Sequence, residues 1–265
     1  MRIILPIKQV PETNAVHMDP ETGTMIREGV EAIVNPLDLY AIELAIQLAE
    51  AHGGETVAVT MGPPKAVSAL KEALAMGVDS AVLVSDKAFA GADTWSTSYV
   101  LARAIRRIGD FDLVICGERA TDGDTGQVGP GIAAWLDLPV LSYVGKVEGV
   151  GDGVCTVQRL VEDGHEVLEA DLPAVLTVVK EVADPRLPTL RGKQRAKQTE
   201  IPAWGPDEID AEPAKLGLKG SPTRVVKIFR PKITRQCRML RAGDEQAIGA
   251  AADALVEFLR QRELV

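Results

Sequence analysis

Strand-like and helix-like segments alternate through the first half of this chain, and this alternation constrains the fold more than any other feature. Short apolar runs at residues 2–9, 55–61, 80–84 and 112–116 are typical of buried strands. Each run is followed by a segment of helical composition. Strands that alternate with helices at roughly thirty-residue spacing predict an α/β protein with a doubly wound, mostly parallel, Rossmann-like sheet.

A glycine-rich loop follows the fourth predicted strand and leads into a helix near Ile132. Gly123, Gly126 and Gly129 are expected to take positive φ, so that successive N–H groups point into one concavity. A concavity between a strand's carboxyl end and a helix's amino end suits a phosphate. The loop matches neither the P-loop nor the usual dinucleotide fingerprint, so by spacing alone a glycine-rich surface turn is an equal alternative.

Other predicted loops favour the phosphate site. Right-handed crossovers place the loops after each parallel strand along one edge of the sheet. We therefore expect residues 6–9, 35–38, 61–63 and 122–131 to converge there. At residues 35–38 the sequence Asn-Pro-Leu-Asp predicts a helix start, with Asn35 as the cap and Asp38 near the positive end of the helix dipole. Between these loops, the polar residues 12–34 are expected to form a short hairpin.

The second half of the chain has a different character. Residues 140–147, 154–161, 166–172 and 174–179 are predicted strands joined by glycine-rich turns, which an antiparallel edge of the sheet would explain. Beyond them the chain is rich in proline and cations, then in proline and glycine, and it closes with an amphipathic helix at residues 244–264. The expected parts are an α/β domain at 1–183, a basic loop at 184–200, and an extended arm with the C-terminal helix at 201–265.

Composition excludes several classes of function. Lys and Arg number 29 against 38 Asp and Glu, a net charge of −9 that argues against nucleic-acid binding. No apolar run approaches the length of a membrane span, and the first residues are expected to form a strand rather than a signal peptide. The cysteines, Cys116, Cys155 and Cys237, lack zinc or redox spacing, which favours the cytoplasm. Asp122 and Asp124 are too weak a signal for a metal site, and no residue pattern indicates a catalytic group.

Several motifs together resemble the beta subunit of electron-transfer flavoproteins. The most specific runs from Val157 through the Asp163-Gly164 turn to Leu172-Pro173-Ala174-Val175. The Pro185-Arg186-Leu187-Pro188-Thr189-Leu190 segment is equally characteristic, as are residues 8–11, 35–38, 73–77 and the 122–131 loop. The resemblance extends over nearly the whole chain, with its motifs in the expected order. It implies a nucleotide-binding subunit that pairs with an alpha subunit carrying a second FAD.

Carried over by position, the resemblance implies a set of residues that contact the nucleotide. Thr94 and Thr97 are expected near the flavin end of a complete FAD. The full set of expected contacts is Pro6, Asn35, Met61, Thr94, Thr97, Asp122, Gly123, Asp124, Thr125, Gly126, Gln127, Val128, Gly129 and Ala133.

The family has two branches, one holding AMP as a structural ligand and the other holding FAD. The loop here resembles the FAD-holding branch, since Gly123 leaves room for a second phosphate and Thr125 adds a neutral donor. The resemblance then implies that electrons from NADH are bifurcated to an acyl-CoA dehydrogenase type of enzyme and to ferredoxin or flavodoxin. The alternatives are a scaffold subunit with AMP, and an ATP-dependent enzyme or stress-type sensor on the same fold.

The resemblance also implies two surfaces for partners. Leu187, Leu190 and Arg191, in the expected 184–200 loop, would dock the dehydrogenase, with Leu190 as an apolar anchor inside a polar rim. A solvated basic loop is the alternative, because most charge runs are solvated. The arm and helix at 201–265 are expected to pack on the alpha subunit.

Overall fold

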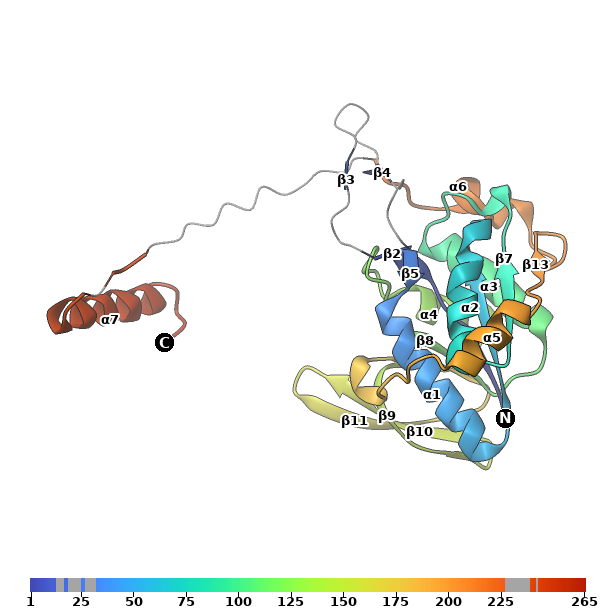
Figure 1. The fold of residues 1–265 in the computed structure, drawn as a ribbon, viewed down its shortest axis with the longest axis horizontal. Helices are drawn as coiled ribbons and strands as arrows, with labels where there is room; N and C mark the ends of the chain where they lie inside the picture. The colour runs from blue at the N-terminus through green and yellow to red at the C-terminus, as the bar shows by residue number, and fades with distance from the viewer. Residues whose placement is uncertain (13–16, 19–24, 27–31, 227–238, 242) are drawn as a thin grey trace. The chain divides into compact units, whose positions relative to one another are not determined.

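The computed structural model describes residues 1–12, 17–18, 25–26, 32–226, 239–241 and 243–265. The chain divides into two compact units, Met1–Val226 and Lys227–Val265, and each is described by itself. Figure 1 shows the elements of both units.

A nine-stranded sheet forms the centre of the first unit, with the order β11-β10-β9-β12-β8-β1-β6-β7-β13. All neighbours from β9 to β13 pair in parallel, and β9, β10 and β11 pair antiparallel at one edge. This confirms the predicted α/β fold with a mostly parallel sheet. The strands are β1 (Arg2–Pro6), β6 (Glu55–Met61), β7 (Ser80–Val84), β8 (Leu113–Gly117), β9 (Val140–Gly151), β10 (Val154–Val161), β11 (Gly164–Asp171), β12 (Ala174–Val178) and β13 (Ala203–Trp204).

Helices cover both faces of the sheet (Figure 1). Helices α1 (Pro36–His52) and α2 (Val67–Met76) pack against the face that carries Ile3 and Leu5. Helices α3 (Thr94–Ile108) and α4 (Val128–Leu136) pack against the opposite face, which carries Ile4. Because successive side chains of a strand point to opposite faces, the uninterrupted apolar run of β1 serves both cores.

The position of strand β12 in the sheet differs from the predicted one. Residues 174–179 were expected at an antiparallel edge, yet Ala174–Val178 lies inside the sheet, parallel to both β8 and β9. All five of its residues are buried. An Ala-Val-Leu-Thr-Val run with no polar alternation is the pattern of a strand covered on both faces, and this distinguishes it from the half-exposed strands before it.

Two small sheets and several single turns complete the first unit. Strand β2 (Gln9–Pro11) pairs antiparallel with β5 (Ala32–Val34), and β3 (His17–Met18) pairs antiparallel with β4 (Met25–Ile26), as the expected hairpin requires. The short 3₁₀ helices are η1 (Pro64–Ala66), η2 (Lys87–Phe89), η3 (Lys180–Val182) and η4 (Pro213–Lys215).

Residues 184–226 are more ordered than the sequence predicts. The expected loop at 184–200 contains helix α5 (Leu190–Gln198), which begins where the Thr189 hydroxyl accepts a hydrogen bond from the Gly192 N–H. The expected extended arm contributes β13 to the sheet and a short helix α6 (Gly217–Gly220). Ile209 and Leu216 are buried. The arm therefore belongs to the compact unit as far as Val226.

The second unit contains helix α7 (Glu245–Arg260). Asp244 caps it by accepting a hydrogen bond from the Ala247 N–H, and its bounds agree with the predicted C-terminal helix. None of the described helices is long and apolar enough to cross a membrane. Cys116 and Cys155 are buried free thiols, and Cys237 falls outside the described residues.

Candidate nucleotide-binding site

The predicted loops meet at the carboxyl edge of the parallel strands. The Asn35 side-chain amide donates to the Arg119 carbonyl at 2.9 Å and accepts from the Thr121 N–H at 3.1 Å. On the other side of the loop, Lys8 Nζ lies 2.6 Å from Asp122 Oδ1. Segments that follow β1, precede α1 and follow β8 are thereby joined, and residues 119–122, which lead into the glycine-rich loop, are held at this junction.

Asp38 is the centre of this junction, and only 5% of its surface is exposed. Its Oδ2 accepts the Lys8 N–H at 2.7 Å, its Oδ1 accepts the Asn35 amide at 2.9 Å, and it also accepts the Gly117 N–H. Burial raises the pKa of Asp38 to about 7, although these hydrogen bonds oppose the shift. A Cβ on Gly117 would lie 2.6 Å from Asp38 Oδ1, so only glycine allows this contact.

Asn35 does not cap helix α1 with its side chain, which corrects the predicted cap. Its amide is used instead to hold residues 119–121 and Asp38. The reason is burial: Asn35 is almost fully enclosed, and an enclosed amide must satisfy its donors and acceptor with the groups around it.

The glycines of the loop have three different roles, whereas the sequence predicts one. Gly126 has φ +62°, as expected, but Gly123 and Gly129 do not have positive φ. Gly129 lies in the first turn of α4, where a Cβ would stand 2.5 Å from Thr177 Cγ2 and 2.9 Å from Cys116 Sγ. Gly129 therefore permits close packing of a helix on two strands. Asp124 is a second residue of positive φ, at +52°.

The loop exposes a row of backbone donors. The N–H groups of Thr125, Gly126 and Gln127 have no hydrogen-bond partner within the part of the chain that the structure describes. The next two belong to the first turn of α4, whose N–H groups have no partner inside the helix. A Cβ on Gly123 would meet nothing within 4 Å. Contiguous donors at a helix start, beside open space, fit the phosphates of a nucleotide.

The amino end of α3 lies against this loop, since the Thr94 hydroxyl is 2.8 Å from Gln127 Oε1. Thr97 is three residues further along α3 and half-buried. The close approach of α3 and α4 depends on Gly131, where a Cβ would meet Ser98 Oγ at 2.6 Å. Thr94 is thus brought to the loop, whereas no hydrogen bond connects the Thr97 side chain to it among the described residues.

The remaining expected contacts lie at the same edge of the sheet. Pro6 and Met61 are the last residues of the neighbouring strands β1 and β6. Val128 begins α4, and Ala133 is buried one turn later. The structure therefore brings the strand ends and the loop together, while Ala133 packs into the core that α4 covers.

Sequence reasoning did not find three residues of this site. Lys8 pairs with Asp122, and Arg119 Nε lies 3.1 Å from Asp124 Oδ1, so the aspartates that resembled weak metal ligands form ion pairs. Both cations lie two residues beyond the observed ends of β1 and β8, a position that could have indicated them. Tyr143 has φ +59°, and a Cβ on Gly126 would lie 3.8 Å from its hydroxyl; nothing in the sequence indicates that contact.

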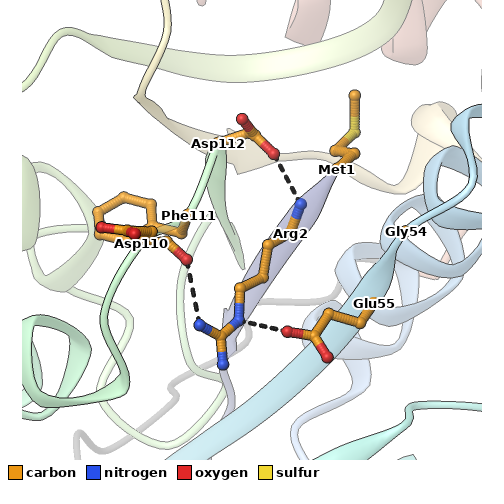
Figure 2. Close-up of a pocket in the computed structure, with 7 residues that line it drawn as sticks. All are labelled: Met1, Arg2, Gly54, Glu55, Asp110, Phe111 and Asp112. Atoms are coloured by element: carbon orange, nitrogen blue, oxygen red, sulfur yellow. Dashed lines mark hydrogen bonds and ion pairs between the residues drawn. The ribbon is translucent and has the colours of Figure 1, made fainter.

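A hollow at the opposite, amino end of the strands has a different character (Figure 2). Arg2 Nε lies 2.6 Å from Glu55 Oε1, and the Arg2 N–H donates to Asp112 Oδ2 at 2.7 Å. The Arg2 guanidinium also donates to the Asp110 carbonyl at 3.3 Å. The charged groups here bind the starts of three strands to one another, and we assign the hollow a structural role.

Of the residues expected to dock a dehydrogenase, Leu187 lies just before α5, and Leu190 and Arg191 lie in its first turn; α5 packs on α2. Leu187 and Leu190 are 86% and 87% exposed, and Arg191 is also exposed. These two exposed apolar side chains, three residues apart, could form part of a surface for a partner.

The fold and the loop together place the chain among α/β proteins that present ligand loops at the carboxyl edge of a doubly wound sheet. Residues 22–209 match the family model described as the electron transfer flavoprotein domain. The chain is 45% identical over 266 residues to the electron transfer flavoprotein subunit beta of Thermoanaerobacterium thermosaccharolyticum, with both chains covered completely.

Two further relatives have other names. The caffeyl-CoA reductase-Etf complex subunit CarD of Acetobacterium woodii is 44% identical, again over the full length of both chains. Protein FixA of Sinorhizobium fredii is 41% identical over 263 residues, which cover 97% of this chain and 92% of the relative. The chain belongs to the beta subunits of the electron transfer flavoprotein family.

Proposed function

We propose that this subunit holds FAD in the loop site and pairs with an alpha subunit that carries a second FAD. The heterodimer would take electrons from NADH and bifurcate them to a dehydrogenase of the acyl-CoA dehydrogenase type and to ferredoxin or flavodoxin. The observation that carries the proposal is the row of free N–H groups at residues 125–127, continued by the start of α4 and bordered by open space at Gly123.

The residues of the site have separable tasks in this proposal. The N–H groups of the loop bind phosphate oxygens, and the α4 dipole favours their charge. Gly123 leaves space beside them, while the Thr94 hydroxyl donates to Gln127 Oε1 and so holds the amino end of α3 against the loop. The ion pairs of Lys8 with Asp122 and of Arg119 with Asp124 offset two carboxylates that would otherwise repel the phosphates.

The redox chemistry belongs to the bound group, because an isoalloxazine ring exchanges hydride and single electrons. The chain determines where that ring lies and which partners approach it. The relative from Acetobacterium is named as a subunit of a complex with caffeyl-CoA reductase. That name supports a CoA-dependent oxidoreductase as the partner of the exposed leucines.

A subunit holding AMP as a structural ligand is the second candidate, since the same N–H groups could bind a single phosphate. The two are separated by denaturing the purified heterodimer and identifying the released ligands by chromatography. We expect two FAD per heterodimer and no AMP. One FAD with one AMP would contradict the bifurcation proposal and leave the electron-carrier family unaffected.

A substitution tests the role of Gly123 directly. Gly123→Glu should lower the FAD content of this subunit at least about tenfold, because the carboxylate would occupy the open space and repel a diphosphate. Gly149→Glu is the matched control, since Gly149 is also exposed with nothing within 4 Å and lies in β9 away from the loop. Equal FAD in the two variants would refute the role of Gly123.

A further inference from the structure

The segment that carries Leu187 and Leu190 is fastened to the domain on both sides of these leucines. We propose that Arg186 and Arg195 are positioning residues that hold the leucines in a preformed geometry for the dehydrogenase. The inference rests on the proposed docking function and adds to it the residues that determine the shape of the docking surface.

Arg186 fastens the first end to helix α1. Its N–H and its Nε donate to Glu43 Oε2 at 3.0 and 2.9 Å, and its Nη2 donates to Glu43 Oε1 at 3.0 Å. Its Nη1 and Nη2 also donate to the two Glu50 oxygens at 2.7 and 3.0 Å. The backbone and side chain of one residue, directly before Leu187, are thereby joined to two glutamates that lie two turns apart on α1. Two bidentate contacts fix the guanidinium plane as well as its position.

Glu43 is only 3% exposed, so this contact lies at the edge of the core. Burial raises the pKa of Glu43, but the hydrogen bonds from Arg186 and Gln47 outweigh burial and keep the pKa below its usual value. The carboxylate is therefore charged at neutral pH. Removing Arg186 would leave a nearly enclosed anion with one side-chain partner, Gln47.

Arg195 fastens the second end to the end of helix α2. Its Nη2 donates to the carbonyls of Leu74 and Val78 at 2.7 and 2.8 Å, where a cation also complements the helix dipole. Between the two ends, α5 touches α2 so closely that a Cβ on Gly192 would lie 2.1 Å from the Ala75 carbonyl oxygen. These contacts therefore determine the position of α5 on the domain.

The two fastened ends leave the leucines as outward projections from a fixed base. Association costs the ordering of mobile segments, so a surface ordered in advance binds more tightly than a mobile one with the same side chains. Residues 190–198 contain four cations and no acidic residue, and Arg191, Lys193 and Lys197 are exposed. The partner that fits is an apolar socket with an acidic rim.

The test uses the complete heterodimer as electron acceptor of an acyl-CoA dehydrogenase that reduces the wild type. Arg186→Gln and Arg195→Gln should each raise the KM for the heterodimer about tenfold, with kcat and flavin content unchanged. Amide hydrogen exchange of residues 184–192 should become faster in both. Arg186→Lys should recover only part of the affinity, because an ammonium cannot reproduce the two bidentate contacts. Lys146→Gln, which removes an exposed charge on β9, is the control and should match the wild type.

A double-mutant cycle separates positioning from general stability. In the Leu190→Ala background, Arg186→Gln should have little additional effect on KM, because the side chain that it positions is already lost. Additive effects, or faster exchange with an unchanged KM, would show that Arg186 has a structural role only and overturn the inference. A wild-type KM for Leu190→Ala alone would overturn the docking function, and the inference with it.

Discussion

At the residue scale, Asp38 shows how one buried carboxyl group joins three segments at the carboxyl edge of the sheet. It accepts hydrogen bonds from the segment after β1, from Asn35 before α1, and from the end of β8. An amide in place of this carboxylate would set its own N–H donor against one of these donors. Because Asp38 is buried, it would act on the proposed ligand loop by positioning that loop rather than by touching the ligand.

The raised pKa of Asp38 predicts a pH dependence of stability. Its ordinary value is 3.8, and burial raises the pKa in the folded protein to about 7. Between these values the folded state binds the proton more tightly than the unfolded chain does, so this contribution favours folding at low pH. It decreases by up to about 1.4 kcal/mol per pH unit as pH rises from 3.8 to about 7, and above the folded-state pKa there is no further loss.

The variant Asp38→Asn, which has no titrating group at this position, isolates the effect. Urea unfolding at about pH 4.5 and about pH 8 should show the wild type losing stability relative to the variant as pH rises. A stability difference that is constant across this range would contradict the raised pKa.

Gly129 is a second residue whose substitution should clearly change the stability of the protein. Gly129→Ala should destabilise the protein by about 1–3 kcal/mol, because its methyl group overlaps Thr177 and Cys116 and forces α4 off the sheet. Urea unfolding followed by circular dichroism measures the loss, and nucleotide content should fall with it. Gly249→Ala, in a helix with nothing within 4 Å, should not destabilise, so equal losses in the two variants would refute the packing argument.

At the scale of elements, local sequence patterns predicted most strands and helices. They could not predict the positions of strands that depend on long-range pairing. The first four strands and their helices were correctly predicted because their apolar runs and glycine stops are local signals. The predicted position of β12 was wrong because the strand directly follows the β10–β11 hairpin in the sequence and was grouped with it. Its fully apolar run indicated a central strand.

The same distinction applies to the candidate site. The convergence of residues 35–38 and 122–131 followed from topology, whereas the loop itself was identified by its glycines and Asn35 as a nucleotide contact by the family resemblance. Lys8 contacts Asp38 and Asp122, which are 30 and 114 positions away in the sequence, so local patterns could not predict these contacts. The ion pair of Arg119 with Asp124 is local, but its geometry depends on the fold of the loop. Helix α5 was missed because its nine residues are stabilised by contacts with α2 and by the Thr189 cap rather than by an apolar pattern.

At the scale of the whole molecule, the chain consists of a domain with its own core and a separate helix. Taken by itself, α7 buries none of its residues, and its large apolar side chains Ile248, Leu255 and Phe258 are exposed. An isolated amphipathic helix is stabilised mainly by what covers its apolar face. We propose that the alpha subunit supplies this cover.

Substitutions on α7 test this assignment. The double variant Leu255→Asp with Phe258→Asp should no longer co-purify with the alpha subunit, or should do so at least about tenfold less, because charges would replace the apolar face. The double variant Asp253→Asn with Glu257→Gln changes polar residues of the same helix and should assemble normally. Normal assembly of the apolar-face variant, measured by affinity pull-down, would exclude α7 as an essential contact.

The residues in and around α5 form two sets that differ in how freely they can be substituted. Arg186, Gly192 and Arg195 are constrained by α1 and α2 whatever enzyme the protein serves. Leu187 and Leu190 are almost fully exposed, so in the proposed docking role only the partner would constrain them. Exchanging these outward side chains should therefore redirect the protein to another dehydrogenase without rebuilding its scaffold, which makes the segment a natural place to engineer new electron-transfer pairs.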